Sequence, residues 1–85
     1  MNITDALKNL GFTQQEATIY IKLATSTSMT GYEAAKTSGI ARSNAYASLS
    51  YLVENGYAYT IDGNPVHYVA LPKEDLITNA KRSFE

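Results

Sequence analysis

The chain has 85 residues, 45% of them hydrophobic, which allows one modest core and leaves no room for a deep substrate cleft as well. It has no cysteine, which excludes disulfides and thiolate metal sites and favours a reducing compartment, so we expect a cytoplasmic protein. Its net charge of −1 does not favour a polyanionic partner. No apolar run approaches the roughly 20 residues of a membrane helix, and residues 1–5 do not resemble a signal peptide.

The first 25 residues predict two helices. Apolar residues at helical spacing predict a helix over 4–10, and Gly11 is placed to end it. Thr13 and Glu16 form a capping-box pattern, in which the hydroxyl caps an amide and the carboxylate reaches back. A second helix is therefore expected over 14–25. Its apolar face comprises Ala17, Tyr20, Leu23 and Ala24.

Residues 30–55 predict two further helices separated by a short turn. Thr30 and Glu33 repeat the capping-box pattern and begin a helix over 31–38, whose inner face is Ala34 and Ala35. Gly39 is suited to the left-handed conformation that ends a helix. A longer helix over 41–55 follows. Its apolar stripe comprises Ala45, Leu49, Leu52 and Val53. Its opposite side is polar and nearly uncharged, with Ser43, Asn44, Ala47, Tyr51 and Glu54.

The hydrophobic period changes after residue 56. Residues 57–61 and 66–70 are rich in aromatic and β-branched side chains, and the turn signal Asp62-Gly63-Asn64-Pro65 separates them. These features predict a β-hairpin that ends at Pro72. A last helix is expected over 73–84. Its apolar face comprises Leu76, Ile77 and Ala80.

The order of these elements predicts a mainly α fold with a small β-hairpin, an α+β winged helix-turn-helix. The helices on either side of Gly39 are separated by about three residues, which is the helix-turn-helix spacing, and the hairpin follows directly as a wing. We expect residues 1–72 to form this domain. Residues 73–85 are then a C-terminal helix for dimerisation or a linker.

Several stretches of the chain resemble TrmB-like transcriptional regulators. Residues 10–20, LGFTQQEATIY, are similar to that family's opening L-G-L-T-x-x-E-A-x-V-Y, and residues 38–46, SGIARSNAY, are similar to its S-G-I-P-R-S-x-V-Y. Leu49, Leu52, Glu54, Gly56 and Tyr57 continue the pattern, and residues 63–65 and 68–72 resemble its wing. Two positions depart from the family pattern: Ala41 replaces a frequent proline, and residues 57–70 carry no Lys or Arg.

The resemblance implies sequence-specific binding to double-stranded DNA as a homodimer. In the family a longer C-terminal region often binds sugars. This chain lacks that region, so we expect no small-molecule effector site in it. The apolar face after Pro72, together with the first helix, is the expected dimer surface.

Candidate DNA-binding residues lie in the first two turns of the predicted helix over 41–55, namely Arg42, Ser43, Asn44, Ala47 and Ser48. Arg42 can contact a phosphate or a guanine edge, Asn44 can pair with adenine, and Ala47 can touch a thymine methyl group. The alternative is a solvated helix face. Such a face usually carries Glu and Lys pairs, which this one lacks.

Four more residues are candidates for phosphate contacts. Thr30 and Tyr32 open the preceding helix, whose free amides suit a phosphate, although Thr30 alone can serve as a simple cap. Lys36 can neutralise a phosphate or simply be solvated. Tyr51 is expected to point outward and donate a hydrogen bond to phosphate.

Other functions have weaker support in the sequence. Tyr57 and Tyr59 have the alternate spacing of a stacking platform for single-stranded bases, although packing against the helices is the commoner reason for such residues. His67 has no second His or Cys nearby, so neither a metal nor a cofactor is expected. The acidic residues are too scattered for paired-carboxylate chemistry, so we do not expect an enzyme.

Two hypotheses follow from the sequence. The first is a DNA-binding transcriptional regulator whose helix over 41–55 reads the major groove. The alternative is a winged helix that binds protein and not DNA, which the net charge and the uncharged wing favour. Neither hypothesis involves a membrane.

Overall fold

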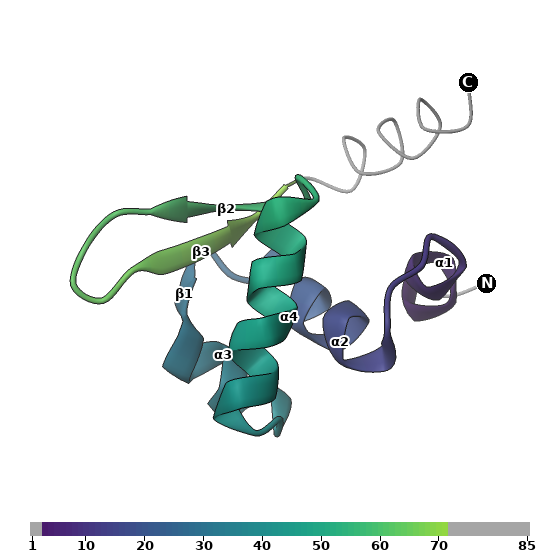
Figure 1. The fold of residues 1–85 in the computed structure, drawn as a ribbon, viewed down its shortest axis with the longest axis horizontal. Coiled ribbons are helices and arrows are strands. Elements are labelled where there is room, and N and C mark those ends of the chain that lie inside the picture. Colours follow the sequence, from purple (N-terminus) through teal and green to yellow (C-terminus); the bar gives the residue numbers. More distant parts are fainter. Residues whose placement is uncertain (1–2, 72–85) are drawn as a thin grey trace.

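The computed structural model describes residues 3–71, which form four α-helices and one three-stranded antiparallel sheet (Figure 1). The helices are α1 (Ile3–Asn9), α2 (Gln14–Ala24), α3 (Gly31–Ser38) and α4 (Arg42–Glu54), and the strands are β1 (Met29–Thr30), β2 (Ala58–Ile61) and β3 (His67–Ala70). Helices α3 and α4 are the helix-turn-helix and the β2–β3 hairpin is the wing, so the expected winged fold is confirmed. The helix expected over 73–84 lies outside the described residues.

Helices α2 and α3 both begin with the predicted capping box. The Thr13 hydroxyl accepts the N–H of Glu16 at 3.1 Å, and the Glu16 carboxylate accepts the N–H of Thr13 at 2.9 Å. Thr30 and Glu33 make the same two bonds at 3.1 and 2.9 Å. Each cap satisfies amides that a helix start leaves unpaired and contributes about 1 kcal/mol.

The turn between α3 and α4 is made by Gly39. Its φ of 66° is left-handed, a conformation that side chains other than glycine rarely adopt. The next residue, Ile40, donates its N–H to the carbonyl of Ala35 at 3.1 Å, which closes the end of α3. The chain can therefore reverse in a few residues and begin α4 at Arg42.

The sheet contains a third strand, β1, which was not predicted from the sequence. β1 has two residues, too few to show alternation, and pairs with β3 through Met29–Tyr68 and Thr30–His67. The strand order is β1-β3-β2. Because β1 runs directly into α3, this pairing ties the root of the wing to the first turn of the helix-turn-helix.

The core lies between the four helices and the sheet. Its buried hydrophobic residues are Leu7, Phe12, Ala17, Ile19, Tyr20, Leu23, Ala34, Ala35, Ala45, Leu49, Leu52 and Ala58. On α2, Ile19 is fully buried although it was not on the predicted face, and Ala24 is exposed although it was. The reason is that α2 contacts α1, α3, α4 and β3, so it is covered on more than one side.

The end of the wing is held to α2 by one buried tyrosine. The Tyr20 hydroxyl donates to the carbonyl of Leu71 at 2.7 Å, and the N–H of Leu71 donates to the carbonyl of Tyr57 at 3.1 Å. These bonds hold Leu71, the last described residue, against α2 and the start of the wing. Within residues 3–71, no helix is both long enough and apolar enough to span a membrane.

Candidate nucleic-acid interface

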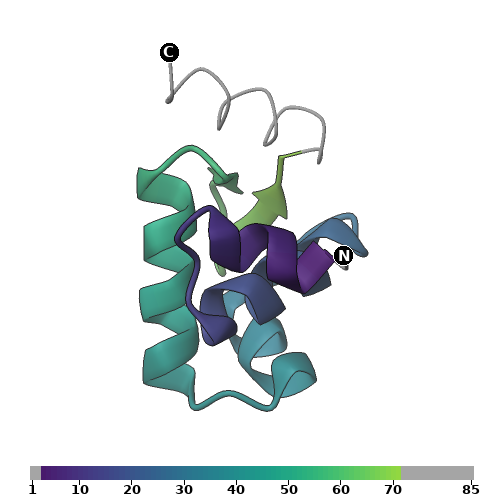
Figure 2. The ribbon, with the colours of Figure 1, turned by 90° about the vertical axis from the view of Figure 1, so that its right-hand side faces the viewer.

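Helix α4 stands at one side of the molecule, and no other described element covers its outer face (Figure 2). Its buried residues Ala45, Leu49 and Leu52 face the core. The residues directly opposite them at 3.6 residues per turn are all exposed: Ser43, Ala47, Ser50 and Glu54. We call these four residues the α4 stripe. Three of the four are small and uncharged, so the stripe suits close approach to another surface.

Arg42 and Asn44 lie on opposite flanks of the α4 stripe. Residues two apart on a helix point about 200° apart around its axis. Both side chains are exposed in the first turn of α4, next to Ser43. The N-cap residue Ala41 provides no side-chain acceptor for the amides of that turn. Polar side chains of this turn are therefore exposed on both flanks of the α4 stripe.

The first turns of α3 and α4 meet on the Arg42 flank. The Arg42 guanidinium lies over the Tyr32 ring, 5.1 Å from its centroid, which is a cation–π arrangement. Lys36, also exposed, lies one turn after Tyr32 on the same side of α3. Arg42 thus contacts the Tyr32 ring and Lys36 lies one turn from it, while the exposed carboxylate of Glu33 directly follows Tyr32.

A second aromatic contact joins these two turns. Gly31 is buried, and a Cβ at this position would overlap the ring of Tyr46. Tyr46 follows Arg42 by four residues, so both side chains leave α4 toward the start of α3. Tyr46 itself keeps 42% of its surface exposed.

The Thr30 hydroxyl is occupied by the cap, since it accepts the N–H of Glu33. The pKa of Glu33 is held below its ordinary value, first by the hydrogen bond from the Thr30 backbone and then by that from its side chain. The capping interpretation of Thr30 is therefore confirmed. A phosphate contact at this turn stays a prediction.

Two expected site residues are placed differently from the prediction. Ser48 is only 5% exposed, because it lies three residues after Ala45 and four before Leu52 and so shares their stripe. Ser48 was expected among the DNA-binding side chains of the first two turns, and its burial on the core side does not fit that role. Ser50 occupies the exposed position instead, and helical spacing could have identified it.

Tyr51 does not point freely outward. Its ring packs edge-on against Phe12, with centroids 5.8 Å apart, and lies 6.2 Å from the ring of Tyr57. Burial raises the pKa of Tyr51, with smaller contributions from Tyr57 and Glu16. The expected orientation was wrong because the turns before α2 and β2 cover this side of α4. Spacing along the helix itself contains no signal for that contact.

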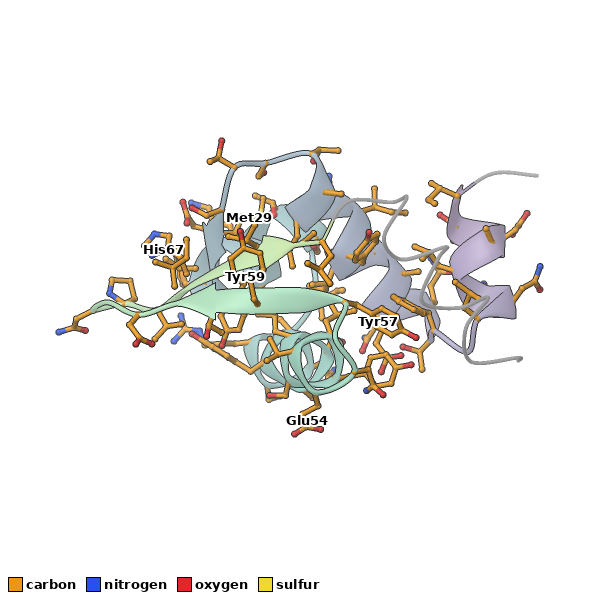
Figure 3. All side chains as sticks on the ribbon, turned by 90° about the horizontal axis from the view of Figure 1, so that it is seen from above. Met29, Glu54, Tyr57, Tyr59 and His67 are labelled. Atoms are coloured by element: carbon orange, nitrogen blue, oxygen red, sulfur yellow. The ribbon has the colours of Figure 1, made fainter. Side chains whose placement is uncertain are left out.

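The stacking platform for single-stranded bases is not formed. Tyr57 packs into the aromatic cluster, with its ring centroid 4.8 Å from that of Phe12. Tyr59 is 50% exposed on the other side of β2, away from α4 (Figure 3). The two rings therefore do not form one surface.

The wing and α4 are separated by an open groove of about 230 Å³, lined by Ser50, Val53, Glu54, Thr60 and Tyr68. Glu54 projects from the outer side of α4 at this end (Figure 3). Since Arg42 and Glu54 are 12 residues apart, about 18 Å separates them along the helix axis. The exposed side of α4 is thus basic at its start and acidic at its end.

His67 sits in the wing, at the start of β3. Its Nδ1 lies 3.2 Å from the carbonyl oxygen of Pro65. In the described part of the chain, no group of three His, Asp or Glu side chains could hold a metal ion.

Comparisons with known proteins agree with this architecture. The family model described as "Sugar-specific transcriptional regulator TrmB" matches residues 7–74. The uncharacterized protein YrhO of Bacillus subtilis (strain 168) is 40% identical over 84 residues, which is 99% of this chain and 30% of that protein.

Two solved structures share the fold. TrmBL2, an archaeal chromatin protein described as showing a novel mode of DNA binding, has a TM-score of 0.88 at 20% identity, covering 96% of this chain and 33% of its own. The ST1889 protein of Sulfolobus tokodaii has a TM-score of 0.73 at 18% identity, covering 84% and 74%. The chain thus spans about a third of the length of YrhO and of TrmBL2. From the family match and the shared fold, the chain belongs to the TrmB family of transcriptional regulators.

Proposed function

We propose that this chain is a DNA-binding domain of a transcriptional regulator and that α4 reads the major groove of duplex DNA. The observation that carries the proposal is the α4 stripe, which is exposed, small and uncharged over its first three positions. A solvated helix face usually carries several charged residues, whereas a face that enters a groove needs small and polar ones. Membership of a regulator family and the DNA binding described for TrmBL2 support it.

Each candidate side chain has a distinct role in this proposal. Asn44 makes a bidentate contact to adenine, Ala47 contacts a thymine methyl group, and Ser43 donates to a base or a phosphate. Arg42 contacts a phosphate or a guanine edge. Ser50 extends the surface toward the wing and replaces Ser48, which is buried.

Contacts outside α4 are made to the DNA backbone. Lys36 neutralises a phosphate, and Tyr32, one turn before Lys36 at the start of α3, lies beside that phosphate. The amides around Thr30 add to this backbone contact. Tyr51 contributes only through its hydroxyl, since its ring packs against Phe12.

The scarcity of basic residues implies that a single domain binds weakly. With Lys36 and Arg42 as the phosphate contacts, the salt slope is about −2 for one domain and about −4 for a dimer.

We therefore propose a cytoplasmic homodimer in which residues 1–72 bind DNA and residues 73–85 contribute to dimerisation or link to a further region. Truncation after Pro72 then yields a monomer in sedimentation. A dimer that survives truncation contradicts this assignment.

The experiment is selection of genomic duplexes at low salt, followed by affinity measurements on the selected duplex over a salt series. Asn44→Ala weakens binding and relaxes preference at one base position, with little change in salt slope. Arg42→Ala, if the contact is to phosphate, weakens binding to all duplexes and lowers the slope by about one unit. Gln15→Ala, at an exposed position of α2, is the matched control and leaves binding unchanged.

The outcome that contradicts the proposal is equally specific. If Asn44→Ala and Arg42→Ala both bind as the unmodified protein does, while thermal unfolding shows an intact fold, α4 does not read DNA. If no duplex is selected at all, DNA is not the partner.

One observation favours a second candidate, a protein-binding module. The wing carries no Lys or Arg, and its exposed hydrophobic residues are Tyr59, Ile61 and Val66. Such a surface suits an apolar protein partner better than a phosphate backbone. Tyr59→Ser together with Ile61→Ser separates the two candidates, because these changes leave duplex affinity unaltered if α4 alone binds DNA.

A further inference from the structure

Arg42 makes a cation–π contact with the ring of Tyr32, and no other exposed basic residue in the described part of the chain has such a contact. Its guanidinium carbon lies 5.1 Å from the centroid of the Tyr32 ring. A guanidinium over the face of an aromatic ring is attracted by the negative charge of that face. Tyr32 itself is 52% exposed, so its ring is not placed there by burial in the core.

The backbone beneath this pair is held firmly. The Tyr46 ring covers Gly31, the residue before Tyr32, so the first turns of α3 and α4 are packed together. The pairing of Thr30 with His67 in β3 fixes the same turn from the other side. These contacts hold the backbones of Tyr32 and Arg42 close together, so the Tyr32 ring lies where it can give the long arginine side chain a preferred rotamer.

We propose that Tyr32 is a positioning residue that holds the Arg42 guanidinium in its binding conformation before DNA arrives. The inference rests on the proposed function, in which Arg42 contacts DNA, and it identifies Tyr32 as the residue that orients the Arg42 side chain. An unrestrained arginine has to give up rotamer freedom on binding, whereas one already resting on a ring loses less. Because a ring face is not a conventional hydrogen-bond acceptor, the contact leaves guanidinium N–H groups available for a phosphate or a guanine edge.

The test is a double-mutant cycle on the selected duplex. Tyr32→Phe keeps the ring, and Tyr32→Leu keeps apolar bulk without a π face, so the two variants form a matched pair. We expect Tyr32→Leu to weaken binding about two- to fivefold, the range for an exposed cation–π pair. Tyr32→Phe should bind within twofold of the unmodified protein. In the Arg42→Ala background, Tyr32→Leu should have no further effect.

A second measurement on the free protein does not depend on DNA. The Tyr32 ring should shift the NMR signals of the Arg42 δ-methylene protons upfield. The shift should persist in Tyr32→Phe and disappear in Tyr32→Leu, while thermal unfolding shows that both variants are folded.

Each result has one meaning. An absent shift in the unmodified protein overturns the inference whatever DNA does. A shift that is present in a protein that binds no duplex rejects the proposed function and leaves the stacking geometry intact. A loss of affinity in Tyr32→Leu that persists in the Arg42→Ala background, or a loss in Tyr32→Phe, means that Tyr32 contacts DNA itself and overturns the positioning role.

Discussion

The contact between Gly31 and Tyr46 predicts that Gly31→Ala destabilises the protein when Tyr46 is present and stabilises it when Tyr46 is replaced by Ala. In Gly31→Ala the new methyl group overlaps the Tyr46 ring, so the ring has to move outward. Tyr46 is already 42% exposed, so moving it removes contacts over at most about 145 Å². At about 25 cal/mol/Å² the loss is at most about 3.6 kcal/mol, and a partial displacement of the ring loses less. Against it stands the preference of helices for Ala over Gly, which is up to about 1 kcal/mol. We expect Gly31→Ala to lower the free energy of unfolding by about 1–2 kcal/mol.

The Tyr46→Ala background removes the obstacle. There Gly31→Ala should raise the free energy of unfolding, by up to about 1 kcal/mol, because only the helix preference remains. Urea unfolding of the four proteins in the cycle measures the coupling between the two sites, and thermal unfolding should shift by about 4–8 °C per kcal/mol. If Gly31→Ala changes the free energy of unfolding in the same direction in both backgrounds, the Tyr46 ring does not rest on Gly31 in solution. The first turns of α3 and α4 are then not packed as described.

Three further predictions concern charge and hydrogen bonding. Glu33→Gln should be less stable than the unmodified protein at pH 7, and the difference should close as the pH falls below about 4. The reason is that the folded pKa of Glu33 lies below its ordinary value of 4.5, so the carboxylate is stabilising only while it is ionised. Thermal unfolding at pH 7 and at pH 3 measures the difference. Glu54→Gln should strengthen duplex binding about twofold at low salt and less at high salt, since one charge about 8 Å from a phosphate in water costs about 0.5 kcal/mol; an unchanged affinity would place Glu54 away from the DNA. Tyr20→Phe should lower the free energy of unfolding by about 1 kcal/mol, because the carbonyl of Leu71 loses its hydroxyl donor; urea unfolding that shows no loss would contradict the importance of this bond.

What the sequence by itself determined are the features that depend on neighbours within four residues. The two capping boxes, the left-handed Gly39 and the stripe Ala45, Leu49 and Leu52 all follow from local geometry, and the structure has them as predicted. The family resemblance then identified the fold, because its motifs span several elements in the correct order.

What only the tertiary structure decided are the contacts between elements that lie far apart along the chain. β1 exists because β3 offers it a partner, and Tyr51 is covered because Phe12 and Tyr57 come from other turns. The stacking of Arg42 on Tyr32 likewise needs α3 and α4 to meet at their first turns. The physical reason is that side-chain burial and ring contacts depend on where whole elements pack, and no spacing within one helix contains that information.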